Sequence, residues 1–284
     1  DPVTSYFAIK SLKLRNSNVK IVLESHGDFI ETIALEKKLF IPAIYKKLFK
    51  LISSYSIKNA DQIRSISSFT EEQVKAYGYL GNFVRFPAWI NLDKFLQAKI
   101  NRDTHDDFKI IFVGSVTDRK NPDLIVRAIS KLDREISLEI IGPTPNKTYL
   151  NELKESISNS RHKENISLTP FIPIDKLIKK YSNANLFILP SKSEGLGRVV
   201  IEAQATACPV LVSSNTGSVD LIIDNETGYI FENNNLNDLK NKIELIINHY
   251  DQALQIGINS KNFVVQNHTI ENFKFGYKKL FDLA

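Results

Sequence analysis

Residues 186–207 read LFILPSKSEGLGRVVIEAQATA, and this stretch decides the fold of its domain. The first four residues are apolar and strand-forming, which is typical of a strand buried on both faces of a parallel sheet. A loop with two glycines follows, and a helix begins directly after it at Arg198. A strand, a glycine loop and a helix in immediate succession are typical of the ligand-binding edge of a doubly wound α/β sheet.

The alternation of strand and helix extends over residues 108–231. Short apolar runs predict strands at residues 110–113, 138–141, 166–168, 186–189, 210–212 and 229–231. Helical periodicity between them predicts helices at residues 122–132, 148–158, 174–181, 198–207 and 219–223. This order predicts a doubly wound, Rossmann-like parallel sheet. After residue 231 only helices are predicted, at 236–250, 252–265 and 269–283.

The first hundred residues show fewer strands, predicted at 19–24, 62–67 and 83–86. About three strands are few for a stable doubly wound sheet. We therefore expect a partial Rossmann-like N-terminal domain at residues 1–97 and a complete one at 98–268. A C-terminal helix at 269–284 is expected to pack back on the first domain. The chain starts at Asp1 and has no methionine, so we expect this start to be an internal cut or an engineered one.

The composition is that of an ordinary globular protein. The 284 residues are 43% hydrophobic and 24% charged, which excludes a disordered or fibrous chain. A single cysteine, Cys208, excludes an internal disulfide, and five scattered histidines argue against a histidine metal centre. The net charge of +5 suits anionic ligands, and we expect no nucleic acid partner. No apolar run reaches the length of a membrane span, so we expect a cytoplasmic protein, soluble or peripheral on the inner membrane face.

Two glutamates flank the start of the predicted helix at 198–207. Glu194 lies in the loop and Glu202 lies about one turn into the helix. The helix N-terminus favours an anion, and carboxylates accept hydrogen bonds from vicinal hydroxyls, so a phosphate attached to a sugar or ribose fits this arrangement. A tight turn shaped by the glycines, with solvated glutamates, remains the alternative.

Two other functions fit the same residues less well. A dinucleotide fingerprint needs a small third residue, but Val200 stands there, and the motif follows the fourth strand of its domain instead of the first. A pair of carboxylates is also found in glycoside hydrolases, but that chemistry needs no phosphate-binding helix start.

A second loop carries two cations. Gly114 ends the strand at 110–113, and Arg119 and Lys120 precede a helix opened by Pro122. Cations at the same edge of the sheet could neutralise a diphosphate leaving group. An ordinary exposed basic turn is the alternative.

These motifs resemble the retaining glycosyltransferases of family 4, which have the GT-B fold of two Rossmann-like α/β domains. The resemblance rests on the Glu-x7-Glu motif Glu194 to Glu202 inside PSKSEGLGRVVIEA, followed by Pro209-Val210 and Thr216-Gly217. It implies that Glu194 contacts the donor sugar and that Glu202 holds the ribose hydroxyls. It also implies that the phosphates are contacted by the backbone of Gly195, Leu196, Gly197, Arg198 and Val199.

The resemblance extends to the other loops of this domain. Lys120 matches the family's diphosphate-binding lysine, but Ser115, after Gly114, stands where an arginine is expected, and Arg119 is our candidate substitute. The segment Pro170-Phe171-Ile172 matches the base-binding loop, so Phe171 and Ile172 are candidate donor contacts. Phe171 could instead be a core residue among its apolar neighbours.

Two features of the first domain bear on function. Glu24-Ser25-His26-Gly27 resembles the loop whose histidine faces the donor sugar, so His26 is a candidate active-site residue, with a structural role as the alternative. Residues 37–58 carry six lysines and no acids among apolar residues. Such a helix can contact an anionic membrane surface, or it can pack on the sheet with its lysines outward.

The resemblance implies a retaining glycosyltransferase that moves a sugar from a nucleotide diphosphate sugar to an acceptor hydroxyl. It implies no metal and no cofactor besides the donor substrate, and an acceptor that is a glycan, a lipid-linked molecule or a small molecule. Two alternatives stay open: a nucleotide-sugar epimerase, and a fragment that binds the nucleotide sugar without catalysis.

Overall fold

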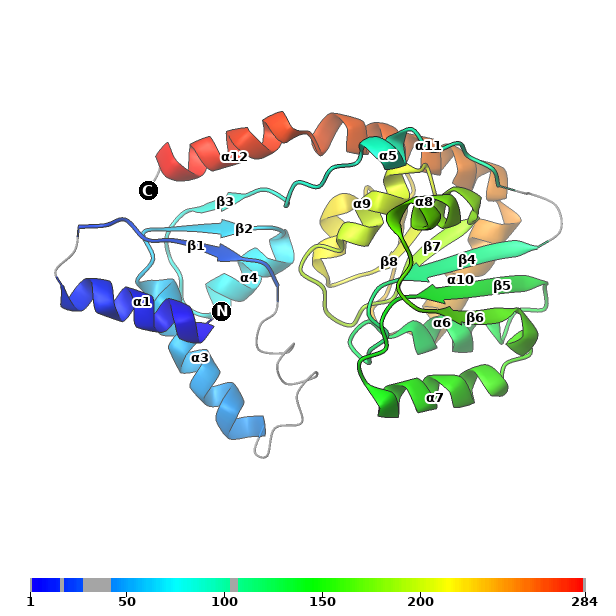
Figure 1. Ribbon diagram of the computed structural model, residues 1–284, viewed down its shortest axis with the longest axis horizontal. Helices are drawn as coiled ribbons and strands as arrows, with labels where there is room; N and C mark the ends of the chain where they lie inside the picture. The colour runs from blue at the N-terminus through cyan, green and yellow to red at the C-terminus, as the bar shows by residue number, and fades with distance from the viewer. Residues whose placement is uncertain (1, 16–17, 28–41, 103–106, 283–284) are drawn as a thin grey trace. The chain divides into compact units, whose positions relative to one another are not determined.

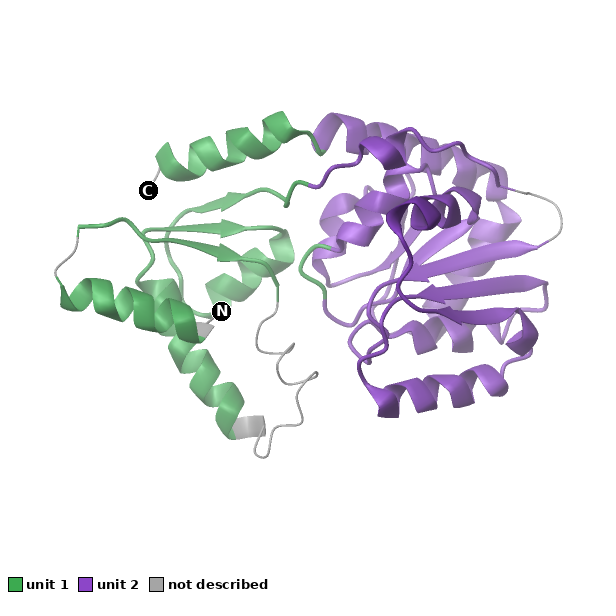
Figure 2. Ribbon diagram, viewed as in Figure 1, with its two compact units in different colours: residues 1–89, 194–196, 268–284 green, residues 90–193, 197–267 purple. Residues whose placement is uncertain are grey.

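The computed structural model describes residues 2–15, 18–27, 42–102 and 107–282. The chain divides into two compact units, coloured separately in Figure 2. Unit 1 comprises residues 1–89, 194–196 and 268–284, and unit 2 comprises residues 90–193 and 197–267. Each unit contains its own parallel sheet.

Unit 2 contains a six-stranded sheet in the order β6-β5-β4-β7-β8-β9 (Figure 1). Its strands are β4 (Phe108–Val113), β5 (Ile136–Ile141), β6 (Ile166–Thr169), β7 (Leu186–Leu189), β8 (Val210–Ser213) and β9 (Tyr229–Phe231). Every neighbouring pair is parallel, which confirms the predicted doubly wound α/β sheet. The strand order reverses between β4 and β7, and this reversal creates the switch point at which such sheets bind ligands.

Apart from the short helix α5, which the sequence did not predict, the α-helices of unit 2 follow the predicted order. They are α5 (Asp93–Leu96), α6 (Pro122–Ile129), α7 (Lys147–Ser158), α8 (Ile174–Asn183), α9 (Arg198–Ala205), α10 (Leu236–Asn248) and α11 (Tyr250–Asn267), with a 3₁₀ turn η1 (Lys163–Asn165). The α-helix predicted at 219–223 is wrong, because the chain forms a 3₁₀ turn η2 (Gly217–Leu221) there. From Ile222 the backbone is already extended, so too few residues remain for a stable α-helix.

The core of unit 2 lies on both faces of the central strands. All four residues of β7 are buried, and so are Leu124, Ile125 and Ile129 of α6. Burial on both faces explains why β7 is an uninterrupted apolar run without alternation.

Unit 1 contains a three-stranded parallel sheet in the order β1-β2-β3. Its strands are β1 (Val22–Ser25), β2 (Gln62–Ser65) and β3 (Phe83–Arg85), and its helices are α1 (Pro2–Leu14), α3 (Pro42–Lys58), α4 (Ser68–Ala76) and α12 (Ile270–Asp282). The helix α4 starts with a capping box between Ser67 and Thr70.

The last helix of the chain, α12, packs on β2 and β3 of this unit (Figure 1). A Cβ atom added to Gly276 would lie 2.5 Å from Cγ of Phe86, so only glycine permits this close approach. Among the described helices, none has the length and hydropathy that a membrane crossing requires.

Candidate functional site

The loops after β4 and β7 are joined at the switch point of unit 2. The backbone N–H of Lys192 donates to the carbonyl of Arg119 at 2.8 Å. In return Arg119 Nη1 donates to the carbonyl of Ser193 at 3.0 Å. Lys192 Nζ also forms an ion pair with Asp118 at 2.5 Å. The structure therefore brings together the two loops that the sequence indicated, and the guanidinium of Arg119 braces the loop that leads to Glu194.

Glycines shape the start of the first loop. Gly114 and Gly142 follow β4 and β5 with φ angles of 153° and 148°. A Cβ atom on Gly142 would lie 2.0 Å from the carbonyl oxygen of Gly114, so a side chain there would separate the two strand ends. The half-buried Lys120 lies over the same point, with its Cδ 4.0 Å from the Cβ position of Gly114. Ser115, also half-buried, follows Gly114 directly.

The N-terminus of α9 follows a glycine and has no side-chain cap among the described residues. Gly197 precedes the helix with φ 80°, and no side chain of the described residues caps the first turn. A Cβ atom on Gly197 would lie 2.5 Å from Oγ of Ser218, a hydroxyl that is 1% exposed and has no partner among the described atoms. Uncapped N–H groups and the helix dipole favour a phosphate here. The side chain of Arg198 is exposed, and Val199 is half-buried.

Glu202 is held by a tyrosine that the sequence did not indicate. The hydroxyl of Tyr181, on α8, donates to Glu202 Oε2 at 3.3 Å and lies 3.4 Å from the carbonyl of Val199. Burial raises the pKa of Glu202, and the hydrogen bond from Tyr181 and the charge of Arg198 lower that pKa only in part. In the sequence Tyr181 fits the apolar periodicity of its helix, and this pattern predicts a core residue and gives no sign of a contact with Glu202.

Residues 194–196 belong to unit 1 and contact its strand ends (Figure 2). Oγ of Ser67 donates to the carbonyl of Gly195 at 2.6 Å. A Cβ atom on Gly195 would lie 2.2 Å from the carbonyl oxygen of His26, so glycine is required for this approach. Glu194 is half-buried and Leu196 is 4% exposed. The structure therefore brings Gly195 and the loop of His26 together within this unit.

The loop after β6 carries the candidate base contacts. Phe171 is 82% exposed, so the alternative of a core role for this ring is wrong. Ile172, the next residue, is half-buried. Apolar neighbours in the sequence suggested a core, but the loop lies outside the sheet, where its ring is accessible.

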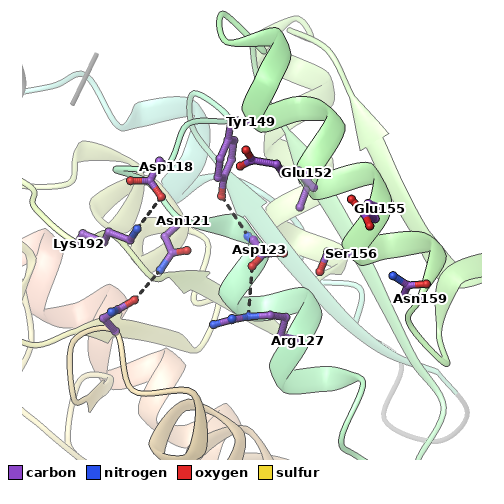
Figure 3. A pocket seen from close by; sticks show the side chains of 12 residues that line it. Asp118, Asn121, Asp123, Arg127, Tyr149, Glu152, Glu155, Ser156, Asn159 and Lys192 are labelled. Carbon is purple, nitrogen blue, oxygen red and sulfur yellow. Dashed lines mark hydrogen bonds and ion pairs between the residues drawn. The ribbon is translucent and has the colours of Figure 1, made fainter. Parts of the chain in front are cut away.

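A pocket of about 540 Å³ lies beside the joined loops, between α6 and α7 (Figure 3). Figure 3 shows Lys192 pointing to Asp118 and Asp123 lying between Tyr149 and Arg127. The pocket's charged lining residues are four carboxylates and two cations: Asp118, Asp123, Glu152, Glu155, Arg127 and Lys192. This excess of negative charge disfavours a diphosphate, so the pocket is not the site expected for the donor.

Within the described ranges, no group of three or more His, Cys, Asp or Glu residues is placed to hold a metal ion.

The fold is similar to that of solved glycosyltransferase structures. Anabaena Alr3699/HepE in complex with UDP-glucose aligns with a TM-score of 0.82 at 12% identity, over 99% of this chain and 77% of that one. Sucrose-phosphate synthase from Thermosynechococcus elongatus aligns with a TM-score of 0.80 at 21% identity, over 98% of this chain and 73% of that one. These likenesses show the GT-B fold class, with two Rossmann-like sets of parallel strands.

Relatives by sequence are bacterial and archaeal glycosyltransferases. The capsular polysaccharide biosynthesis glycosyltransferase CapM of Staphylococcus aureus is 27% identical over 201 residues, covering 68% of this chain and 51% of CapM. The O-antigen biosynthesis glycosyltransferase WbnH of Escherichia coli is 29% identical over 236 residues, covering 83% and 64%. The chain thus spans about half the length of several curated relatives that it matches.

The family of this chain is shown by a family profile that matches most of unit 2. The profile of the family described as Glycosyl transferases group 1 matches residues 93–263, more than half of the chain. That range includes both joined loops, α9 and Glu202. The chain therefore belongs to the group 1 glycosyltransferases.

Proposed function

We propose that this protein transfers a sugar from a nucleotide diphosphate sugar to an acceptor hydroxyl, with retention of anomeric configuration and without a metal ion. One observation carries the proposal: the two loops at the switch point are joined to each other, and the second leads into the uncapped N-terminus of α9. A diphosphate bound there would meet backbone N–H groups and cations.

In this mechanism the departing diphosphate is stabilised electrostatically. Lys120 and Arg119 offset its charge, and the backbone of residues 195–199 donates hydrogen bonds to it. A guanidinium has five N–H donors, so Arg119 can brace Ser193 and contact a phosphate oxygen together. Arg119 is held by Ser193 before the bond to the sugar breaks, and such preorganisation is the condition under which electrostatic stabilisation is strong.

The remaining residues recognise the rest of the donor. Glu202, held by Tyr181, accepts hydrogen bonds from the ribose hydroxyls, and Glu194 orients the sugar. Phe171 and Ile172 contact the base, and the exposed ring of Phe171 offers a stacking surface. His26 contacts the sugar.

The proposal is tested by replacing Glu194 and Lys120, to which it assigns the donor sugar and the diphosphate. Glu194→Ala and Lys120→Ala should abolish transfer while circular dichroism and Tm stay unchanged. Lys131→Ala, at an exposed position of unit 2, should keep wild-type turnover. Near-normal turnover in both active-site variants would overturn the assignment.

Turnover of a panel of UDP and GDP sugars would identify the base of the donor. Among the relatives, one is named a GDP-mannose-dependent mannosyltransferase, and a similar structure contains UDP-glucose, so both bases belong in the panel. The anomeric configuration of the product, read by NMR, tests retention. Turnover that persists in EDTA tests independence from a metal ion.

The same assays separate the two alternatives. An epimerase would convert the free donor without an acceptor, and a non-catalytic binding fragment would bind donor without turnover. The glycosyltransferase names of the relatives favour transfer over epimerisation.

We further propose peripheral membrane contact through α3, which supports a lipid-linked acceptor. Residues 37–41 of the predicted basic segment lie outside the described residues. The helix α3 has no acidic residue, packs on α1 and exposes Ile44, Leu48 and Leu51 by 50–62%. Exposed apolar residues beside the lysines of α3 suit an anionic lipid surface.

Co-sedimentation with vesicles tests this contact. Binding should require phosphatidylglycerol in phosphatidylcholine vesicles and should fall in Lys47→Glu/Lys50→Glu. The same charge change in α12, Lys278→Glu/Lys279→Glu, is the matched control and should bind as the wild type does. Equal loss in both variants, or binding to pure phosphatidylcholine, would contradict a role for α3.

A further inference from the structure

A buried arginine lies at the centre of unit 1. Arg64 is on the middle strand β2, and its side chain is 2% exposed. The parallel register places Glu24 of β1 directly beside it, and Arg64 Nη1 donates to Glu24 Oε2 at 2.8 Å. A buried guanidinium is costly unless it is paired, so this ion pair fixes where the carboxylate of Glu24 lies.

Further contacts prevent the guanidinium from turning. Its Nη2 donates to the carbonyls of Phe86 and Pro87, at 3.4 and 3.2 Å. Its central carbon lies 4.1 Å from the ring centroid of Phe86 and 5.1 Å from that of Tyr277. Hydrogen bonds in the plane and aromatic rings against the faces leave one orientation for Arg64.

The carboxylate of Glu24 receives three donors. Besides Arg64, the hydroxyl of Tyr277 on α12 donates to Oε1 at 2.6 Å, and Nε2 of His26 lies 2.9 Å from Oε2. Burial alone would raise the pKa of Glu24, but the hydrogen bonds from Tyr277 and His26 and the charge of Arg64 outweigh it and lower that pKa. Glu24 is therefore ionised near neutral pH and can only accept hydrogen bonds.

The ionised carboxylate of Glu24 determines which nitrogen of the His26 ring carries a hydrogen. Because the carboxylate only accepts, Nε2 of His26 must carry the hydrogen that joins them. Nδ1 is then the ring atom that can contact a substrate. The side chain of His26 is 58% exposed, so the ring is accessible while one edge is held.

We propose that Glu24, itself held by Arg64 and Tyr277, is a positioning residue that fixes the orientation and tautomer of His26 for its contact with the donor sugar. The catalytic part of this inference rests on the proposed function. The alternative is a structural role, in which Glu24 only neutralises Arg64 and the contact with His26 has no consequence for turnover.

The first test needs no turnover. In protein labelled with ¹⁵N on the histidine rings, at low temperature and at a pH where imidazole is neutral, His26 should show a slowly exchanging, downfield Nε2–H resonance. The signal is assigned by its loss in His26→Gln. Absence of such a resonance from the wild type would overturn the positioning role, whatever the enzyme's activity.

The second test removes Glu24 without leaving a buried charge. Glu24→Leu/Arg64→Met replaces the ion pair by apolar side chains, a change that folded proteins often tolerate. The Nε2–H resonance should disappear, and kcat should fall about tenfold or more, to the level of His26→Ala, while KM for the donor stays unchanged. The same substitutions at the Glu71–Arg85 pair of this unit, Glu71→Leu/Arg85→Met, should leave the resonance and kcat unchanged.

A milder variant keeps the test decisive if that pair replacement does not fold. Tyr277→Phe removes one donor from Glu24 and one acceptor of Arg64 Nη1, and it leaves the ion pair between Glu24 and Arg64 in place. It should lower kcat severalfold with KM unchanged, whereas Tyr79→Phe, which removes a weakly bonded hydroxyl of the same unit, should not. Wild-type kcat in a folded Glu24 or Tyr277 variant would overturn the catalytic part. If the wild type turns over no donor, the proposed function fails. The Nε2–H resonance of His26 still decides whether Glu24 fixes the histidine ring.

Discussion

The hydroxyl of Tyr181 donates a hydrogen bond to Glu202 Oε2 at 3.3 Å, from a side chain that is fully buried. One carboxylate oxygen of Glu202 is therefore oriented from α8 before any ligand binds. A carboxylate held in this way accepts hydrogen bonds from a vicinal diol without first losing the freedom of its side chain.

Tyr181→Phe should weaken binding of the nucleotide. The variant removes one hydrogen bond worth ~1 kcal/mol, so the Kd for UDP or GDP, whichever binds, should rise about fivefold by isothermal titration calorimetry. The control Tyr149→Phe removes a buried tyrosine hydroxyl elsewhere in unit 2 and should leave Kd unchanged. An equal effect in both would argue against a specific role for Tyr181.

Glu202→Gln should stabilise the protein at neutral pH. Burial raises the pKa of Glu202 above its ordinary value of 4.5, so the folded protein holds this proton more tightly than the unfolded chain does. The stabilisation from that proton is complete below pH 4.5 and is lost as the pH rises through the folded-state pKa. The variant should therefore have a higher Tm than the wild type at pH 7, and the difference should shrink below pH 4.5.

The control for this prediction is Glu226→Gln, at an exposed carboxylate of the same unit. Its Tm difference from the wild type should not change with pH in this way. A Glu202→Gln protein that is no more stable than the wild type at pH 7 would contradict the inference that the buried charge of Glu202 destabilises the folded protein.

Gly197→Ala should destabilise the fold by two separable effects. The φ angle of 80° costs an alanine about 1–2 kcal/mol, and the added Cβ would lie 2.5 Å from Oγ of Ser218. Adding Ser218→Ala should recover the steric part of the loss in Tm but not the backbone part. Full recovery in the double variant, or no loss in the single one, would show that the turn adapts to a side chain.

Phe171→Ala should affect binding without affecting stability. The ring is 82% exposed, so its removal should leave Tm unchanged. If the ring stacks on the base, Kd for the nucleotide should rise about tenfold. Phe275→Ala, which removes another exposed ring, is the control and should leave Kd unchanged.

The fold could be predicted from the sequence because the central strands β7 and β8 of unit 2 are buried on both faces. The run LFIL at β7 is entirely buried, and its predicted ends match the observed ones. A glycine or a proline directly after the strand then marked the ends of β4, β5, β6 and β7. The 3₁₀ turn at Gly217–Leu221 was missed because its short apolar run has the same periodicity as a helix start.

The candidate site could be predicted only where it is local in sequence. The glycine loop, Glu202 and the basic loop stand in short motifs, and the structure joins the two loops. The contacts of Glu24 with Arg64 and Tyr277 span 40 and 253 positions along the chain. Partners this far apart leave no periodicity or spacing in a single sequence, so only the folded chain could show them.

Unit 1 is complete only when α12 packs on its sheet, and this affects the order in which the two units fold during synthesis. Its core cluster joins Val84 and Phe86 to Leu280, and Tyr277 on the same helix holds Glu24. The ribosome needs roughly 10–40 s to make the intervening residues at about 5–20 residues per second. Unit 2, whose sheet is continuous in sequence, can fold during that interval. We therefore expect the nascent chain to complete its second unit before its first, and to fix His26 only after α12 has emerged.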